Sequence, residues 1–172
     1  KTPMMWGDVI EHIDPLGDDI IFLNWGYGAN VTPEKINMLA EAKKTQIVCP
    51  GVNGWTTLCE RVKESVPNIT KMAQYALDAG AKGMMNTNWG DYGHISPIYA
   101  CMYSIIYGAA RSWNATCEYE EFDGCMDLLY YGYEGASNIV KTIAGSYKTC
   151  YWYELVCDYS NRLFGNDLMR VW

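Results

Sequence analysis

Short apolar runs that end in Trp-Gly recur three times along this chain, and they limit the folds that it can adopt. The three runs occupy residues 3–8, 20–27 and 83–92. A fourth apolar run, residues 45–50, leads into a glycine-containing loop that ends at Trp55. Runs of this length bounded by turn residues are typical of buried strands. The repetition predicts parallel strands whose carboxyl ends surround one pocket.

The residues expected at these strand ends suit a sugar ring. An indole offers a flat apolar face to the C–H groups of a pyranose, and Asp and Asn side chains bond its hydroxyls. Position alone leaves other roles open. Trp6, Trp25 and Trp89 are also consistent with core packing. Asp91 is also consistent with a turn role, and Asp8 with a helix cap.

The pattern of the first two thirds of the chain predicts strands that alternate with helices. We expect strands at residues 2–6, 20–24, 46–49 and 84–88. After the second strand a helix should begin near Thr32 and Pro33, and after the third a short helix over residues 58–65 should precede another that starts at Pro67. Four such units make half of an eight-stranded (β/α)8 barrel of the TIM type, and an open four-stranded sheet is the alternative.

No strand pattern follows the fourth run. Helices are expected from Ser96 to Trp113, over residues 118–131, over residues 137–144 and over residues 147–164. We therefore divide the chain into a half-barrel at residues 1–113 and a helical C-terminal region at residues 114–172 that packs on it. Trp113 is expected to lie in the core or to pack between helices. His94 lacks a neighbouring carboxylate in the sequence to orient it, which favours a turn role over a general base.

Composition excludes several classes of function. The chain has 172 residues and a net charge of −7, which argues against a nucleic-acid partner and an anionic membrane surface. It has no apolar run long enough to span a bilayer, and no signal-peptide pattern. Seven cysteines without CxxC spacing and two histidines make a metal site unexpected, and no cofactor motif is present. Reduced cysteines predict a cytoplasmic location. The chain begins at Lys1, so we expect a piece of a longer protein.

The segment Thr87-Asn88-Trp89-Gly90-Asp91-Tyr92-Gly93 gives a more specific lead. Together with Gly80-Ala81-Lys82-Gly83 before it, this segment resembles the last barrel strand of family 20 glycoside hydrolases, the β-N-acetylhexosaminidases, and bacterial members most closely. Residues 3–8 resemble the fifth strand of that family, residues 22–25 the sixth and residues 49–55 the seventh. The resemblance covers residues 1 to 113.

The resemblance implies a pocket for a terminal N-acetylhexosamine. In that family tryptophans enclose the acetamido group and stack under the sugar, and an acidic residue after the last-strand tryptophan holds ring hydroxyls. By this match Trp6, Trp25 and Trp89 would be pocket walls, and Asp91 the hydroxyl clamp. Asp8 matches the acidic position of the fifth-strand motif. Three further candidates match more loosely, namely Tyr27, Asn53 and Trp55.

One departure from the family concerns catalysis. The family uses the substrate's own acetamido oxygen as nucleophile, and an Asp-Glu pair after the fourth strand orients that group and protonates the leaving oxygen. In this sequence Asp18-Asp19 precedes a strand and Glu120-Glu121 lies in the helical region. We therefore expect no catalytic residue in this chain, and no hydrolysis by the chain alone. The partner would be an N-acetylhexosamine-containing glycan.

A second hypothesis is a non-catalytic glycan-binding or structural module. A half-barrel leaves strand edges unpaired, and such edges recruit other strands. The module would then close its barrel by homo-oligomerisation or with a missing N-terminal half-barrel.

Overall fold

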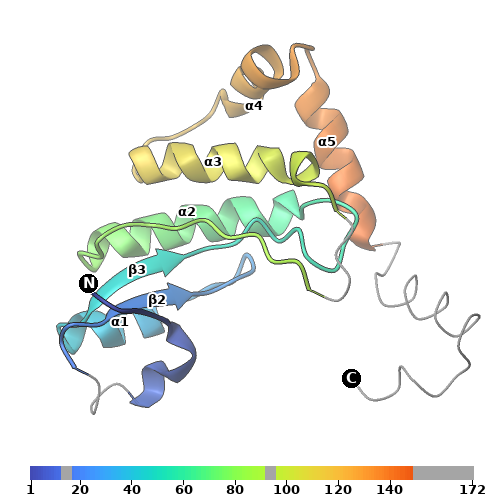
Figure 1. Cartoon of the computed structure of the whole chain (residues 1–172). Helices are drawn as coiled ribbons and strands as arrows, with labels where there is room; N and C mark the ends of the chain where they lie inside the picture. The colour runs from blue at the N-terminus through green and yellow to red at the C-terminus, as the bar shows by residue number, and fades with distance from the viewer. Residues whose placement is uncertain (13–16, 92–95, 149–172) are drawn as a thin grey trace, which may run out of the picture.

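The computed structural model describes residues 1–12, 17–91 and 96–148, and it is a mixed α/β structure built on a small parallel sheet (Figure 1). Strands β1 (Met4–Trp6), β2 (Ile21–Trp25) and β3 (Thr45–Cys49) lie in that order, and both pairs are parallel. The expected α/β class with parallel strands is confirmed. These elements do not close into a barrel.

The fourth expected strand is present as two parallel bridges, Val48 with Met84 and Gly51 with Thr87. Its hydrogen bonds to β3 and the loop after it follow the usual parallel alternation, with Val48 N–H donating to Gly83 and Val52 N–H donating to Thr87. In this alternation the N–H group between those of Val48 and Val52 that should donate to the 84–87 segment is that of residue 50. That residue is a proline, which has no N–H, so the ladder is interrupted. The segment at 84–87 therefore extends the parallel order without forming a continuous strand.

Helices α1 (Glu34–Glu41) and α2 (Val62–Asp78) pack against β3. Ile36 of α1, Val48 of β3 and Met72 of α2 form one buried cluster. Fully burying an aliphatic side chain of this kind contributes roughly 1.5–3 kcal/mol. A second cluster joins Ile10, which lies in the 3-10 helix η1 (Gly7–His12), to Phe22 and Leu39. These clusters fix which face of the sheet the helices cover.

The prediction of two helices over residues 58–77 was wrong, because a single helix, α2, runs through Pro67. A proline inside a helix costs one backbone hydrogen bond. Tertiary contacts offset this cost, because Glu64 and Asn68 on either side of Pro67 bind the loop that follows β2. Local preference is overridden here by bonds to a distant part of the chain.

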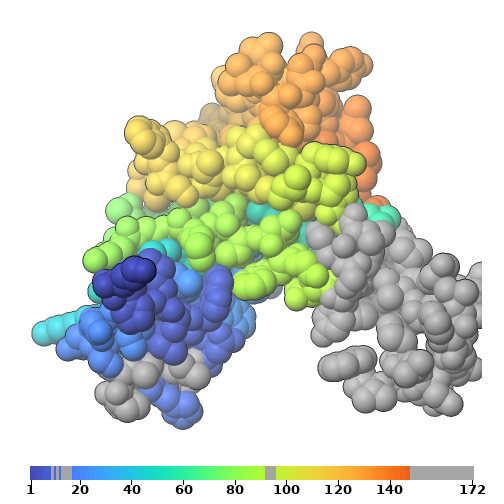
Figure 2. Space-filling model, viewed as in Figure 1, coloured from blue at the N-terminus to red at the C-terminus, as the bar shows by residue number. Residues whose placement is uncertain are grey.

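The elements from residue 98 onward pack on the side of α2 that faces away from the sheet (Figure 1). A 3-10 turn η2 (Ile98–Cys101) leads into α3 (Met102–Trp113), which lies along α2 (Figure 1). The remaining described elements are α4 (Phe122–Met126), a π-helical turn η3 (Asp127–Tyr131), α5 (Ala136–Ala144) and η4 (Gly145–Lys148). In the space-filling view the orange residues of α4 and η3 lie above α3, and the orange-red residues of α5 run down beside it (Figure 2).

A third buried cluster connects these layers. It contains Val62 of α2, Tyr103 of α3, Met126 of α4 and Ala144 of α5. The residues after 113 therefore share a core with α2 and α3. Trp113 does not pack between helices as expected, because its side chain is 92% exposed at the end of α3. It lies at the last residue of that helix, beyond the side chains that reach the cluster. Most of the last expected helix, residues 147–164, lies outside the described residues.

In the part of the chain that the structure describes, no helix combines the length and apolarity required to cross a bilayer.

Candidate functional site

Seven of the eight residues that the sequence nominates for a pocket surround one cavity of about 360 Å³. They are Trp6, Asp8, Trp25, Tyr27, Trp55, Trp89 and Asp91. This volume lies near the lower end of the range for small-molecule sites, roughly 300–1,000 Å³. Residues separated by more than eighty positions in the sequence thus meet at one place.

The strand register explains why these side chains meet. Trp6 is paired with Leu23, and Trp25 is two residues further along β2, so both indoles lie on the same face of the sheet. Thr87 is bridged to Gly51, and Trp89 follows Thr87 by two residues. The same alternation places Trp89 on that face. All three tryptophans lie at the carboxyl ends of parallel strand segments, where α/β folds bind ligands.

The aromatic side chains of the cavity touch one another. The ring centroids of Trp6 and Trp89 are 5.1 Å apart, although their segments lie on opposite edges of the parallel order. Trp25 stacks on Tyr27 at 5.3 Å and 19°, and Trp55 meets the same Tyr27 edge-on at 4.9 Å. Contact between the first and fourth segments indicates that the sheet curls around the cavity. We call these five residues the aromatic wall.

A hydrogen bond links the Trp6–Trp89 pair to the other three rings of the aromatic wall. The indole N–H of Trp89 donates to the hydroxyl of Tyr27 at 2.6 Å. Burial raises the pKa of that hydroxyl above its usual value, and hydrogen bonds to Thr87 and Trp89 partly oppose the shift. Tyr27 is therefore neutral at physiological pH and keeps its proton for donation.

The two carboxylates of the cavity are exposed. Asp8 lies in the first turn of η1, directly after the Trp6-Gly7 pair. Asp91 follows Trp89-Gly90 in the same way. Both sit at the polar rim of a cavity whose walls are aromatic. This combination suits ligands that are apolar on one face and rich in hydroxyls at their edges.

Asn53, the eighth nominated residue, does not line this cavity. Its side chain is 3% exposed, its backbone φ is 54°, and its amide donates to the carbonyl of Gly51 at 3.4 Å. Asn tolerates this left-handed conformation better than most residues. Asn53 therefore shapes the turn that follows β3. His94 lies outside the described residues.

Sequence reasoning missed the residues that hold the loops in place. Asn68 of α2 is fully buried. Its side-chain NH2 group donates to the carbonyls of Gly26 and Gly28, each at 3.0 Å. Its side-chain oxygen accepts the N–H of Gly51 at 3.0 Å. One side chain thus joins the loops after β2 and β3. Glu64 accepts the N–H of Ala29 at 3.0 Å.

Lys71 completes this set by donating to the carbonyl of Ala29 at 2.7 Å. Glu64, Asn68 and Lys71 are spaced i, i+4 and i+7, so they form one polar stripe on α2. A polar stripe beside the apolar residues Ile69 and Met72 was the signal available in the sequence.

Gly51 is required by the aromatic wall itself. A Cβ atom at this position would lie 2.7 Å from the ring of Trp55 and 2.8 Å from that of Tyr27. Both distances are shorter than van der Waals contact, so only glycine allows the two rings to close over the backbone.

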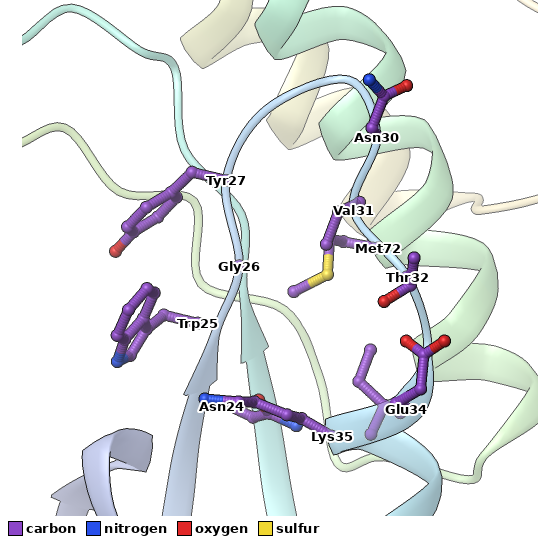
Figure 3. Close-up of a pocket in the computed structure, with 11 residues that line it drawn as sticks. Asn24, Trp25, Gly26, Tyr27, Asn30, Val31, Thr32, Glu34, Lys35 and Met72 are labelled. Atoms are coloured by element: carbon purple, nitrogen blue, oxygen red, sulfur yellow. The ribbon is translucent and has the colours of Figure 1, made fainter.

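A second cavity of about 370 Å³ lies on the side of the β2 end that faces away from the side chains of Trp25 and Tyr27 (Figure 3). It lies along the loop between β2 and α1, and Trp25 and Tyr27 line both cavities. In the described residues no group of three or more His, Cys, Asp or Glu side chains is arranged to hold a metal ion. Neither cavity is therefore a candidate metal centre on its described residues.

No protein-family model matches this chain, and no curated protein matches it.

Proposed function

We propose that this chain provides the sugar pocket of a glycoside hydrolase that acts on terminal N-acetylhexosamine. The observation that carries the proposal is the convergence of the aromatic wall with Asp8 and Asp91 on one cavity at the carboxyl ends of parallel strands. The same residues were selected from the sequence by the family 20 resemblance. The four strand segments would then form half of a (β/α)8 barrel.

In this proposal the walls and the rim have separate tasks. Trp6, Trp25 and Trp89 pack against the pyranose and its acetamido group, and Asp91 accepts hydrogen bonds from ring hydroxyls. The acetamido oxygen of the substrate attacks the anomeric carbon, so the protein supplies no nucleophile. The acid that protonates the leaving oxygen is not among the residues that line the cavity. We accordingly expect no release of nitrophenol from a nitrophenyl N-acetylglucosaminide by residues 1–172 alone.

Calorimetric titration with N-acetylglucosamine and N-acetylgalactosamine tests the binding step. Trp89→Ala should abolish detectable binding, because it removes the stacking surface and the bond to Tyr27. Trp113→Ala is the matched control, since this indole is 92% exposed and lines neither cavity. Circular dichroism checks that both variants fold.

Asp91→Asn provides a second variant, because the site is exposed and the two side chains have nearly the same shape. We expect it to weaken binding by about tenfold, the effect of losing a charge-assisted hydrogen bond. If the wild-type chain binds neither sugar, the proposal is wrong.

A specific observation also supports the alternative of a module that completes its barrel with another chain. Among the described residues β1 pairs on one side only, with β2. An unpaired parallel edge is a template for a further strand. Light scattering over a range of concentrations tests this alternative, and a monomer at high concentration would remove it.

A further inference from the structure

The loop between β3 and α2 brings Trp55 to the aromatic cavity, and this loop has an unfavourable backbone conformation at the next residue. Trp55 lines the cavity and meets Tyr27 edge-on at 4.9 Å. Thr56, which follows it, has a backbone φ of 52°. A β-branched residue rarely adopts this left-handed conformation, because its branched Cβ crowds the backbone. Such a conformation persists only where the surrounding contacts impose it.

Arg61, the residue that precedes α2, supplies contacts of this kind. Its guanidinium nitrogen Nη2 donates to the backbone carbonyl of Trp55 at 2.9 Å and to the hydroxyl of Thr56 at 2.8 Å. Its backbone N–H donates to the carbonyl of Asn53 at 3.2 Å. Hydrogen bonds from a charged donor are stronger than bonds between neutral groups. One side chain at the start of α2 therefore binds both residues of the turn that carries the Trp55 ring.

The C-terminal helical region contacts Arg61 in turn. The guanidinium carbon lies 5.5 Å from the centroid of the Tyr147 ring, which is within the range of a cation–π interaction. Tyr147 belongs to η4, and Ala144 at the end of α5 shares a buried cluster with Val62, the first residue of α2. Figure 1 shows α5 running down beside α3 toward the start of α2. Contacts therefore connect Tyr147 through Arg61 to the backbone of Trp55.

We propose that Arg61 is a positioning residue of the aromatic cavity, and that Tyr147 makes the C-terminal helical region part of the support of this cavity. The inference rests on the proposed function, because it requires that Trp55 pack against the bound sugar. Arg61 does not line the cavity itself. Its bonds hold the Trp55 backbone where the ring closes over Gly51 and meets Tyr27. A ring that is fixed before binding loses little conformational entropy when the ligand binds.

Fluorine NMR of the chain of residues 1–172, labelled with 5-fluorotryptophan, tests the position of the Trp55 ring without any sugar. The signals that are missing from Trp55→Phe and from Trp113→Phe identify these two residues, and the exposed Trp113 is the internal reference. Arg61→Ala should shift the Trp55 signal, because the turn loses both side-chain bonds. Lys63→Ala is the matched control, since this cation is exposed on α2 and lines neither cavity. It should leave the Trp55 signal unchanged.

Two variants of Tyr147 test the contribution of the helical region. Tyr147→Phe keeps the aromatic face that the guanidinium group contacts, so it should leave the Trp55 signal as in the wild type. Tyr147→Ala removes this face and should shift the signal in the same direction as Arg61→Ala, by a smaller amount. Circular dichroism checks that each variant folds. If Arg61→Ala does not fold, this pair decides, and an unshifted signal in Tyr147→Ala overturns the inference.

Calorimetry with the methyl β-glycosides of N-acetylglucosamine and N-acetylgalactosamine measures the consequence for binding. Arg61→Ala should weaken the binding of the preferred glycoside by about fivefold, the effect of one side chain that must be immobilised on binding. Tyr147→Phe and Lys63→Ala should bind it like the wild type. An unshifted Trp55 signal or an unchanged affinity in folded Arg61→Ala would overturn the inference and leave the proposed function standing. Failure of the wild type to bind either glycoside would overturn the proposed function, and the NMR result would still decide whether Arg61 positions Trp55.

Discussion

At the scale of single residues, the aromatic cavity depends on two positions that do not line it. Gly51 lets two rings of the aromatic wall close over the backbone, and Asn68 joins the two loops that carry those rings. Gly51 has no side chain, and the amide of Asn68 is used in bonds to the backbone. Their importance follows from the distances around them.

Gly51→Ala should destabilise the protein by roughly 1–3 kcal/mol, the usual cost of overpacking a rigid site. The new methyl group would lie 2.7 Å from Trp55 and 2.8 Å from Tyr27, so at least one ring must move. Urea denaturation measures the loss of stability, and tryptophan fluorescence of the folded variant reports the displaced ring.

Gly124→Ala is the control for this prediction, because the residue is inside α4 and, apart from its chain neighbours and the backbone of its own helix, no atom lies within 4 Å of the added Cβ. Alanine is the better helix former by roughly 0.5–1 kcal/mol, so this variant should be slightly more stable than the wild type. Equal effects of the two substitutions would show that Gly51 is not in close contact with the rings.

At the scale of elements, the start of α3 is bound by a carboxylate from outside the helix. Glu60 is fully buried, and its two oxygens accept the N–H groups of Tyr103 at 3.0 Å and Ser104 at 2.8 Å. These donors belong to the first turn of α3, which has no partner for them within the helix. Glu60 thus replaces an N-cap side chain, which Cys101 at the N-cap does not provide.

Burial raises the pKa of Glu60 from 4.5 to about 7, and its hydrogen bonds to Ser104 and Tyr103 partly oppose the shift. The folded protein therefore holds this proton more tightly than the unfolded chain does. Its contribution to stability is complete below pH 4.5 and is lost as the pH rises through 7. The free energy of unfolding should fall by up to about 3 kcal/mol over that range.

Chemical denaturation between pH 5 and pH 8 measures this effect. Glu60→Gln has a similar shape and does not titrate, so its stability should depend less on pH than that of the wild type. Glu41→Gln, at an exposed position of α1, should retain the pH dependence of the wild type. An unchanged slope in Glu60→Gln would assign the pH dependence to other groups.

At the scale of the whole molecule, the parallel strands differ in how many neighbouring segments they pair with. Strand β2 pairs on both sides, and β3 pairs with β2 and with the segment at 84–87. Strand β1 has three residues and one partner among the described elements. The central strands should therefore open only with the global unfolding of the protein, whereas β1 opens locally.

Hydrogen exchange read by mass spectrometry should find the slowest amides in β2 and β3 and faster exchange in β1. The measurement is repeated at increasing protein concentration. Protection of β1 that rises to the level of β2 would contradict the prediction and support pairing of another chain with the edge of β1 that is unpaired among the described residues.

Much of the element order follows from local sequence. Apolar runs of four or five residues predicted β2 and β3, and helices were expected at α1 and α5. The convergence of the tryptophans could be anticipated because parallel strands that end alike present their last residues at one edge. Both inferences require only the period of the side chains and the direction of the chain.

Other features were decided by contacts between distant residues. Pro67 continues a helix because its neighbours bind the loop after β2, and Asn53 is buried and does not line the cavity for which it was nominated. Asn68 donates a hydrogen bond to Gly26, which is 42 positions away, and the sequence around either residue does not predict this contact. Periodicity sets the type of an element, because it depends on residues a few positions apart. The partners of a buried polar group depend on how whole elements pack, and this only the tertiary structure determined.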